Sequence, residues 1–283
     1  MANTGKVALV TGGTNGLGLE TSRALLQRGW KVFATSRNPL ASLSGTDVVQ
    51  LDTTDPRSVS SAVATVVEQA GRIDALVNNA SAGLLIGAIE ETPVEDAQAV
   101  FNTNLFGMMR MVDAVLPVMR KQGSGRIVNM SSAAGFLGFP FHASYCASYW
   151  AVEGFTESLR LEVAQHGISV SVVEPDAVAK DPAGTLHPVD THLPVYQQER
   201  ATTVERFAER RKRGVAPVEV GRAVAWVLEQ PHPKLRYRVG KGVKQVRLLK
   251  TFTPESLFER ALRSQFGISP ASGPGGKMKG AGH

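Results

Sequence analysis

A glycine-rich loop close to the start of the chain limits its possible folds more than any other feature. The loop spans residues 11–18 and follows residues 6–11, a short apolar run with β-branched side chains that is typical of a buried strand. A helix is predicted from residue 17 to residue 28. Glycines between a strand and a helix let the backbone approach a pyrophosphate, and the helix N-terminus supplies N–H donors. We therefore predict a dinucleotide site that includes Gly12, Thr14, Asn15, Gly16, Leu17 and Gly18.

Strand-like and helical segments alternate along the rest of the chain. Helices are predicted at residues 58–70, 95–121, 144–165 and 218–229, and Pro117 is expected to bend the last turn of the second. The alternation predicts an α/β fold, a single Rossmann-type doubly wound parallel sheet with helices on both faces. Further strands are predicted at residues 32–36, 48–51, 73–77, 126–130, 168–173 and 237–240.

One large domain is expected over residues 1–268, because a chain of 283 residues that is 43% hydrophobic can bury one substantial core. Residues 176–215 interrupt the alternation and are predicted to form an insertion that covers the substrate. Residues 241–268 are predicted to form a helical extension. Residues 269–283 are rich in Gly, Pro and Ser, which predicts a disordered tail.

The sequence also predicts the cellular compartment and excludes several kinds of site. No run of 18 or more apolar residues occurs, so no membrane span is expected. Residues 1–6 show no signal-peptide pattern. The single cysteine, Cys146, excludes an internal disulfide framework and favours the cytoplasm. No Cys/His cluster is present, so we expect no metal site.

Charge is unevenly distributed along the chain. Residues 200–283 hold 18 basic and 6 acidic residues, whereas residues 1–199 hold 13 basic and 19 acidic ones. The basic C-terminal part is compatible with a solvated surface, with an anionic carrier such as a thioester, or with an acidic membrane surface. Nucleic acid is not expected as a partner, because no recognition motif accompanies the basic residues.

Several polar residues follow the predicted strands at spacings that identify a family. The chain resembles a short-chain dehydrogenase/reductase from about residue 6 to residue 240. The nearest resemblance within that family is to the 17β-hydroxysteroid and retinol dehydrogenase type. Besides the glycine loop, the resemblance depends on Asp52, residues 78–80, Asn104, Ser131, Ser132, and Tyr145 at 13 residues beyond Ser132.

The resemblance implies a nicotinamide dinucleotide cofactor. NAD selection usually requires a carboxylate after the second strand, but Arg37 stands there and could pair with a 2′-phosphate, so we predict NADP(H). Asp52 is expected beside the adenine ring, and Asn78 and Ala80 beneath the adenosine. Ser81 follows where the family usually has glycine. Pro175 is expected to line the nicotinamide end of the site.

The resemblance also assigns the reacting groups. Ser132 would hydrogen-bond the substrate oxygen, Tyr145 would transfer the proton, and Asn104 would hold a water of the proton relay. The family's lysine, one helical turn after the tyrosine, lowers the pKa of that tyrosine and binds the nicotinamide ribose. Here Tyr149 occupies the lysine position. A phenol supplies no positive charge, so we expect proton transfer to be impaired or rerouted, although the Tyr149 hydroxyl could still reach the ribose.

Two further departures lie after the sixth predicted strand. The family expects Pro-Gly and then a threonine, whereas this chain has Asp176 after Pro175 and then Lys180. Loss of the glycine is expected to restrict the backbone where it passes the cofactor. We hypothesise that Lys180 replaces the missing positive charge. If Lys180→Ala leaves turnover and its pH profile unchanged, this hypothesis is wrong.

The segments expected to line the substrate pocket are 82–91, 133–142 and 176–215. The first two are largely apolar, which favours a hydrophobic alcohol or ketone over a sugar. His142 either touches the substrate or lines a loop. The helices at 95–121 and 144–165 resemble the family's dimer-forming pair, so a homodimer or homotetramer is expected.

Three functions remain open from the sequence. The first is an NADP(H)-dependent oxidoreductase that interconverts a hydrophobic alcohol with a ketone or aldehyde. The second is a catalytically weak or inactive subunit of the same family, and the third is a non-redox reaction in the same cleft. Retention of the glycine loop, Asn104, Ser132 and Tyr145 favours the first.

Overall fold

Parallel strands form the centre of the molecule in the computed structural model, which describes residues 5–179 and 186–268. Within these ranges one sheet has seven strands in the order β3-β2-β1-β4-β6-β7-β9, and every neighbouring pair is parallel. The predicted doubly wound α/β fold is therefore confirmed. The strands are β1 (Val7–Val10), β2 (Lys31–Ser36), β3 (Asp47–Gln50), β4 (Ala75–Asn78), β6 (Gly125–Met130), β7 (Ile168–Pro175) and β9 (Arg236–Val239).

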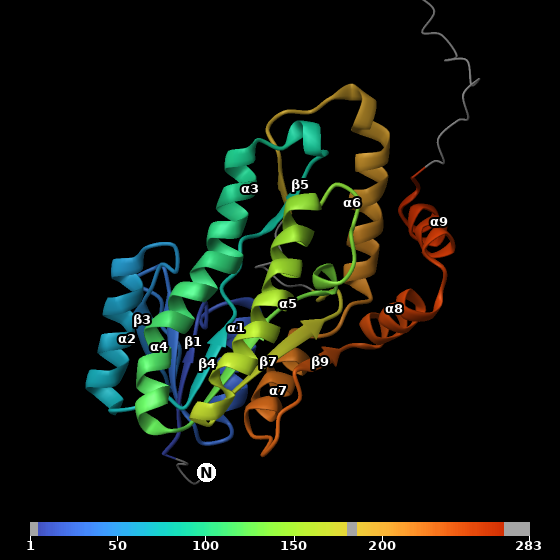
Figure 1. The fold of residues 1–283 in the computed structure, drawn as a ribbon. Coiled ribbons are helices and arrows are strands. Elements are labelled where there is room, and N and C mark those ends of the chain that lie inside the picture. Colours follow the sequence, from blue (N-terminus) through green and yellow to red (C-terminus); the bar gives the residue numbers. More distant parts are fainter. Residues whose placement is uncertain (1–4, 180–185, 269–283) are drawn as a thin grey trace, which may run out of the picture.

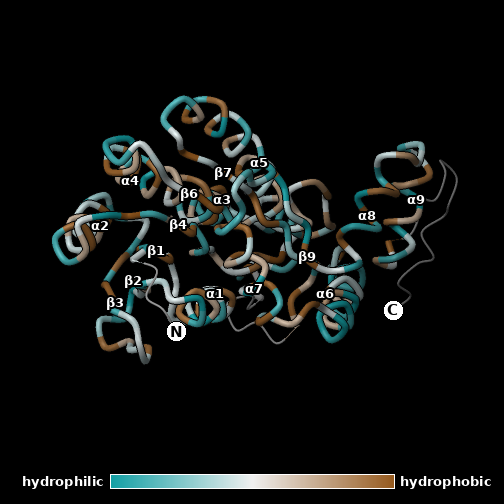
Figure 2. The backbone as a smooth tube through the Cα atoms, turned by 90° about the horizontal axis from the view of Figure 1, so that it is seen from below, coloured by the Kyte–Doolittle hydropathy of each residue, from teal (hydrophilic) through white to brown (hydrophobic). Residues whose placement is uncertain are grey.

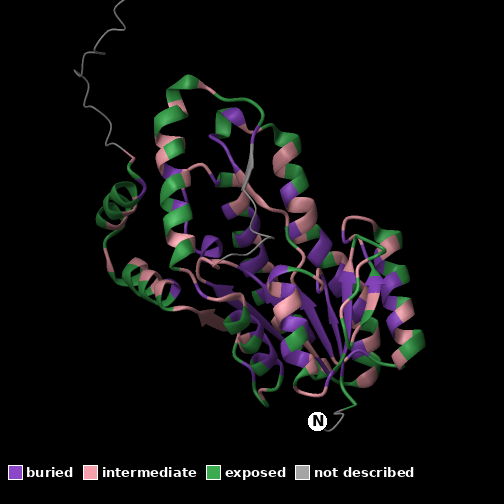
Figure 3. Ribbon diagram, turned by 180° about the vertical axis from the view of Figure 1, so that it is seen from behind, coloured by how far each residue is buried: buried purple, intermediate pink, exposed green. Residues whose placement is uncertain are grey.

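Helices cover both faces of this sheet (Figures 1 and 2). One face packs against α2 (Pro56–Ala70), α4 (Met108–Gln122) and α5 (Ala143–Val163), and the other against α1 (Gly16–Leu26) and α7 (Pro217–Leu228). The central strands are buried on both faces, as Figure 3 shows, which explains their continuous apolar sequences. In β1, for example, Leu9 faces the first helix layer and Ala8 and Val10 face the second.

Local sequence signals account for several helix ends. Asp55 caps α2, because its side chain accepts a hydrogen bond from the N–H of Arg57, and Pro56 takes the first helical position. Gly71 ends α2 and Gly123 ends α4, each in the left-handed conformation.

The helix predicted over residues 95–121 is not continuous. The structure divides it into α3 (Val94–Phe101), the π-helical turn η2 (Asn102–Gly107) and α4. Pro117 lies inside α4, and the helix continues past it to Gln122. Such π turns interrupt α-helices mostly at functional sites, and this one carries the buried side chain of Asn104.

The predicted insertion forms its own small structure beside the sheet. It contains β8 (Leu186–Pro188), which pairs in parallel with β5 (Leu84–Ile86), and the helix α6 (Gln197–Lys212). The expected C-terminal extension forms α8 (Lys241–Phe252) and α9 (Glu255–Phe266), which lie at the outer edge beyond α6 (Figure 1).

Aromatic contacts join the insertion to this extension. The ring centroids of Phe207 and Phe266 lie 5.2 Å apart, and those of Phe139 and Phe207 lie 5.3 Å apart. No helix within the described part of the chain is both long and apolar enough to cross a membrane. The predicted tail, 269–283, lies outside the described residues.

Candidate active site

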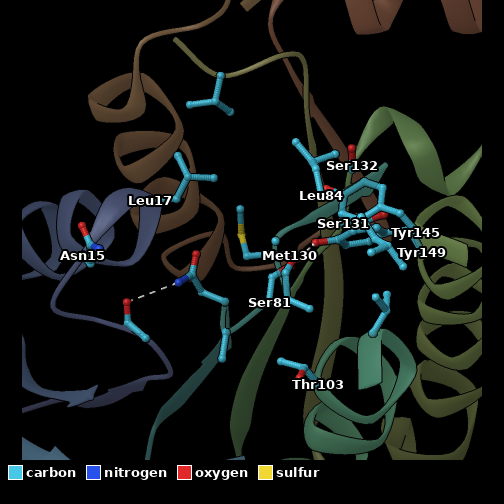
Figure 4. A pocket seen from close by; sticks show the side chains of 18 of the residues that line it. Asn15, Leu17, Ser81, Leu84, Thr103, Met130, Ser131, Ser132, Tyr145 and Tyr149 are labelled. Atoms are coloured by element: carbon cyan, nitrogen blue, oxygen red, sulfur yellow. Dashed lines mark hydrogen bonds between the residues drawn. The ribbon is translucent and has the colours of Figure 1, made fainter. Parts of the chain in front are cut away.

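The C-terminal ends of the parallel strands border a cleft of about 920 Å³. The cleft lies at the switch point between β1 and β4, where open α/β sheets commonly bind ligands. Figure 4 shows Asn15 and Leu17 on one side of it, and Ser132, Tyr145 and Tyr149 on the other.

The glycine loop forms the wall next to α1. Gly12 lines the cleft in the left-handed conformation, with φ at 61°. Gly18 lies behind it, and a Cβ atom there would come within 2.1 Å of the Gly12 carbonyl oxygen. Asn15 caps α1 by accepting a hydrogen bond from the N–H of Gly16. Thr14, Asn15 and Leu17 line the cleft, whereas Gly16 and Gly18 shape the loop beneath it.

The structure places Asn78 and Asn79, at the end of β4, in different surroundings. Asn78 does not line the cleft, because its buried amide donates to Asn129 Oδ1 at 2.9 Å inside the sheet. The alternation of side chains along a strand instead brings the next residue, Asn79, into the cleft. Asn79 donates to the Thr11 carbonyl at 3.0 Å and thereby supports the glycine loop. Ala80 also lines the cleft.

Arg37 and Asp52 lie together at the end of the cleft nearest β2 and β3. Asp52 accepts hydrogen bonds from the hydroxyl of Thr54 at 2.7 Å and from its N–H at 2.8 Å. These bonds, helped by the charges of Arg37 and Arg110, lower the pKa of Asp52. Arg37 is exposed, and the sequence at the end of β2, Thr35-Ser36-Arg37-Asn38, contains no acidic residue.

Tyr145 and Ser132 lie together at the opposite end. Ser132 caps a short 3₁₀ turn, with its Oγ accepting from the N–H of Ala134 at 3.2 Å. Burial raises the pKa of Tyr145 well above its ordinary value, and the neighbouring Tyr149 phenol raises it further. The Ser132 hydroxyl lowers the pKa of Tyr145 but does not offset these effects. Tyr145 is therefore a neutral phenol across the physiological range.

Tyr149 packs directly against Tyr145. The two ring centroids are 4.8 Å apart, with an interplanar angle of 65°. Tyr149 is buried, and its hydroxyl lies 2.9 Å from Ser81 Oγ. The position one helical turn after Tyr145 thus carries a neutral group with a hydroxyl partner. Sequence reasoning noted Ser81 only as a departure from the family pattern and did not predict this contact.

Asn104 supports this end of the cleft from behind. Its Oδ1 accepts from the N–H of Ala82 at 2.8 Å and lies 3.2 Å from Ser81 Oγ. Its Nδ2 donates to Ser148 Oγ at 3.0 Å, and Ser148 in turn donates to the Tyr145 carbonyl at 2.8 Å. The π turn therefore joins the loop after β4 to the helix that carries both tyrosines.

Pro175 and Asp176 line the cleft after β7. The backbone at Asp176 does not have positive φ, which among the described residues only Phe141 and glycines have. Asp176 instead bonds outward. Its Oδ1 pairs with Arg210 of α6 at 2.9 Å, and its Oδ2 accepts from the N–H of Val243 in α8 at 3.1 Å. Lys180 lies outside the described residues.

An apolar wall completes the cleft on the side of the insertion. His142 is buried behind it, 2.7 Å from the Pro140 carbonyl and stacked on Phe207, and burial lowers its pKa. Within the described ranges no group of His, Cys, Asp and Glu could hold a metal ion. The apolar residues of the wall are Leu84, Leu85, Phe139, Val189 and Phe207.

The glycine cradle, the polar end and the reacting pair together fit a dinucleotide that lies along the cleft. Gly12 leaves room where a phosphate would approach the backbone, and α1 presents its N-terminus there. Arg37 and Asp52 suit the adenosine end, and Ser132 and Tyr145 suit the nicotinamide end.

Comparisons with known proteins agree with this arrangement. The 3-ketodihydrosphingosine reductase of Bacteroides thetaiotaomicron is 32% identical over 266 residues, which cover 93% of this chain and 98% of that protein. Human 17-beta-hydroxysteroid dehydrogenase type 1 is 34% identical over 256 residues, covering 82% and 76%. A crystal structure of a short-chain dehydrogenase from Streptomyces avermitilis has a TM-score of 0.79 at 29% identity, covering 93% and 99%.

A family model for short chain dehydrogenases matches residues 6–188, which is more than half of the chain. Since the sheet order, the glycine loop and the relatives all agree with that match, the chain belongs to the short-chain dehydrogenase/reductase family.

Proposed function

We propose that this protein is an NADP(H)-dependent oxidoreductase that interconverts a hydrophobic alcohol with a ketone or aldehyde. One observation carries the proposal. A single cleft joins the glycine loop and Arg37 at one end to Ser132, Tyr145 and an apolar wall at the other. This is the arrangement needed to hold an extended dinucleotide with its reactive end beside an apolar substrate.

When bound, the nicotinamide would supply the hydride. Residues of the glycine loop would hold the pyrophosphate, with Asn79 supporting that loop from behind. Arg37 would bind a 2′-phosphate, because its guanidinium presents several N–H donors at the end of β2, where NAD selection usually requires a carboxylate. Asp52 and Ala80 would lie beside the adenosine, Pro175 beside the nicotinamide, and the Tyr149 hydroxyl within reach of the ribose.

The cofactor preference is tested by measuring NADPH and NADH binding by fluorescence. We expect Arg37→Ala to weaken NADPH binding about 10-fold or more, equivalent to about 1.4 kcal/mol, and to leave NADH binding nearly unchanged. Arg57→Ala, which removes an exposed arginine from α2, is the matched control. Equal losses for both cofactors would contradict the assignment of Arg37.

Ser132 and Tyr145 would handle the substrate oxygen. The Ser132 hydroxyl would orient it, and the Tyr145 phenol would give it a proton as negative charge develops. Because Tyr145 stays protonated at neutral pH, it is able to donate the proton that reduction requires. The proposed working direction is therefore from the carbonyl to the alcohol.

The substrate is proposed to be large and apolar. The wall formed by Leu84, Leu85, Phe139, Val189 and Phe207 supports this, as do the names of a ketodihydrosphingosine reductase and a hydroxysteroid dehydrogenase among the relatives. Arg211 also lines the cleft. An assay panel should therefore pair neutral ketones with an anionic ketoacyl thioester, because only the thioester carries a charge that Arg211 would attract.

Loss of the lysine favours a second candidate, a subunit that binds the dinucleotide but turns over weakly. A paired assay of the unmodified chain and Tyr149→Lys separates the two. NADPH binding with measurable ketone reduction in the unmodified chain supports the first function. Binding with turnover only in Tyr149→Lys supports the second. Failure of both proteins to bind NADPH would contradict both functions.

The assembly is proposed to be a homodimer or homotetramer in the cytoplasm. Several large apolar side chains on η2, α4 and α5 are exposed, and these elements form the pair that associates in the family. The single, buried Cys146 supports a reducing compartment.

A further inference from the structure

Two departures from the family pattern, Ser81 and Tyr149, meet in space although they lie 68 residues apart in the sequence. Ser81 Oγ and Tyr149 OH are 2.9 Å apart, which is hydrogen-bond distance. Tyr149 is buried against Tyr145, whereas Ser81 is exposed and lines the cleft. A side-chain hydrogen bond between the two phenols contributes to the raised pKa of Tyr145, so the three hydroxyl groups lead from Tyr145 through Tyr149 to the exposed Ser81.

The direction of donation along this row is reversible. Asn104 has a fixed amide orientation, because its Oδ1 accepts from a backbone N–H while its Nδ2 donates to Ser148. In one arrangement Ser81 donates to the Ala82 carbonyl at 2.9 Å, with Asn104 Oδ1 farther away at 3.2 Å, and accepts from Tyr149. In the other, Ser81 donates to Tyr149, and Asn104 Oδ1 keeps its bond to Ala82 at 2.8 Å. Reversal therefore gives up the bond from Ser81 to the Ala82 carbonyl and keeps the bond between Ser81 and Tyr149 with its donor exchanged.

We propose that Ser81 and Tyr149 form an uncharged proton relay that replenishes Tyr145 from solvent. The inference rests on the proposed reductase function. When Tyr145 gives its proton to the substrate oxygen, the Tyr149 O–H gives its proton to the Tyr145 oxygen. Ser81 gives its proton to Tyr149 and takes one from water, so that one water proton is consumed for each alcohol formed.

The relay explains why both departures occur together. An ammonium at position 149 would stabilise the Tyr145 phenolate by its charge, whereas a phenol has no charge and can only pass protons. Passing protons requires a second hydroxyl beyond it, and glycine at position 81 would supply none. Ser81 acts through Tyr149, so it is a positioning and relay residue.

The test compares Ser81→Ala, Tyr149→Phe and the double variant in steady-state reduction of an apolar ketone by NADPH, in H₂O and D₂O. We expect each single variant to lose about 10-fold in kcat, a part of the roughly 10²–10⁴-fold that proton-transfer assistance provides. The double variant should be no slower than the slower single variant, because a relay is broken only once. The solvent isotope effect should rise in all three, and Ser81→Thr should restore both quantities.

Tyr237→Phe is the matched control, because it removes a phenol hydroxyl that accepts from the Lys234 N–H and lies outside the cleft. Unchanged kcat and isotope effects in the two single variants would overturn the relay and leave the reductase function intact. Additive losses in the double variant would also overturn it. Tight NADPH binding without turnover in the unmodified chain would overturn the relay and the reductase function together.

Discussion

Tyr149 determines the chemistry of its neighbour at the scale of single residues. It follows Tyr145 by one helical turn, so the two rings contact each other at 4.8 Å between centroids. Burial and this uncharged neighbour both raise the pKa of Tyr145. In the proposed reaction, Tyr145 is therefore a proton donor that ionises only at alkaline pH.

The raised pKa of Tyr145 determines how the rates of reduction and oxidation depend on pH. Reduction needs the protonated phenol, so its kcat/KM should stay level through neutral pH and fall only above the ordinary tyrosine pKa of about 10. Oxidation needs the phenolate, so its rate should rise with pH over the same range. In Tyr149→Lys the added ammonium should shift both profiles to lower pH. A fall in reduction near pH 7 in the unmodified chain would contradict the raised pKa.

Removal of the phenolic hydroxyl of Tyr145 is the companion test. Tyr145→Phe should lower kcat for reduction by about 10²–10⁴-fold and leave NADPH affinity within about 2-fold, about 0.4 kcal/mol, because the lost hydroxyl acts on the substrate oxygen. Stopped-flow reduction and fluorescence titration measure the two quantities. A large loss of NADPH binding would show that Tyr145 has a structural role instead.

At the scale of elements, the cleft depends on how closely the ends of the strands approach the helices. The loop between β1 and α1 is tight, because Gly18 lies against the carbonyl of Gly12. On the other side, Asp176 holds α6 and α8 to the end of β7 through one ion pair and one backbone hydrogen bond. The contact of Gly18 with Gly12 shapes the proposed cofactor end of the cleft, and the bonds of Asp176 anchor the insertion.

Gly18→Ala should displace the loop and weaken NADPH binding by at least about 10-fold, or about 1.4 kcal/mol. The new Cβ would lie 2.1 Å from the Gly12 oxygen, which real structures do not allow. Gly154→Ala is the control, since a Cβ there in α5 meets no atom within 4 Å. That control should raise the free energy of unfolding by about 0.5–1 kcal/mol, as alanine usually does in a helix. Equal NADPH affinity in both variants would contradict this account of the loop.

Asp176→Ala should loosen the attachment of α6 and α8. It leaves Arg210 and the N–H of Val243 without this carboxylate, which should cost about 1–3 kcal/mol in urea unfolding. Limited proteolysis should then cut faster within residues 241–268. Glu209→Ala removes the exposed pair with Lys212 and should cost less than about 0.5 kcal/mol. If the two variants unfold at the same urea concentration, Asp176 is not an anchor.

At the scale of the whole molecule, several exposed apolar side chains bear on the proposed self-association. Phe106, Met109, Trp150 and Leu161 are 46%, 41%, 50% and 80% exposed, and they lie on η2, α4 and α5. Exposed apolar side chains that gather on neighbouring elements commonly mark an interface. They support the proposed self-association.

Light scattering should give the mass of a dimer or tetramer for the unmodified protein. Leu161→Glu should shift the mass towards the monomer, because a charge buried between two copies is costly. Leu40→Glu changes an equally exposed leucine, at 88%, in the loop after β2 and should leave the mass unchanged. A monomeric unmodified protein would contradict the proposed assembly.

The local order of residues was sufficient to predict the fold class, the glycine loop and the spacing of Ser132, Tyr145 and Tyr149. Strand and helix periodicities act over a few residues, and the ends of parallel strands must meet at one edge. The choice between Asn78 and Asn79, the π turn at Asn104 and the outward bonds of Asp176 appeared only in the tertiary structure. The same is true of the contact between Ser81 and Tyr149. Each joins elements that are distant in sequence, and the packing of those elements decides which side chains meet.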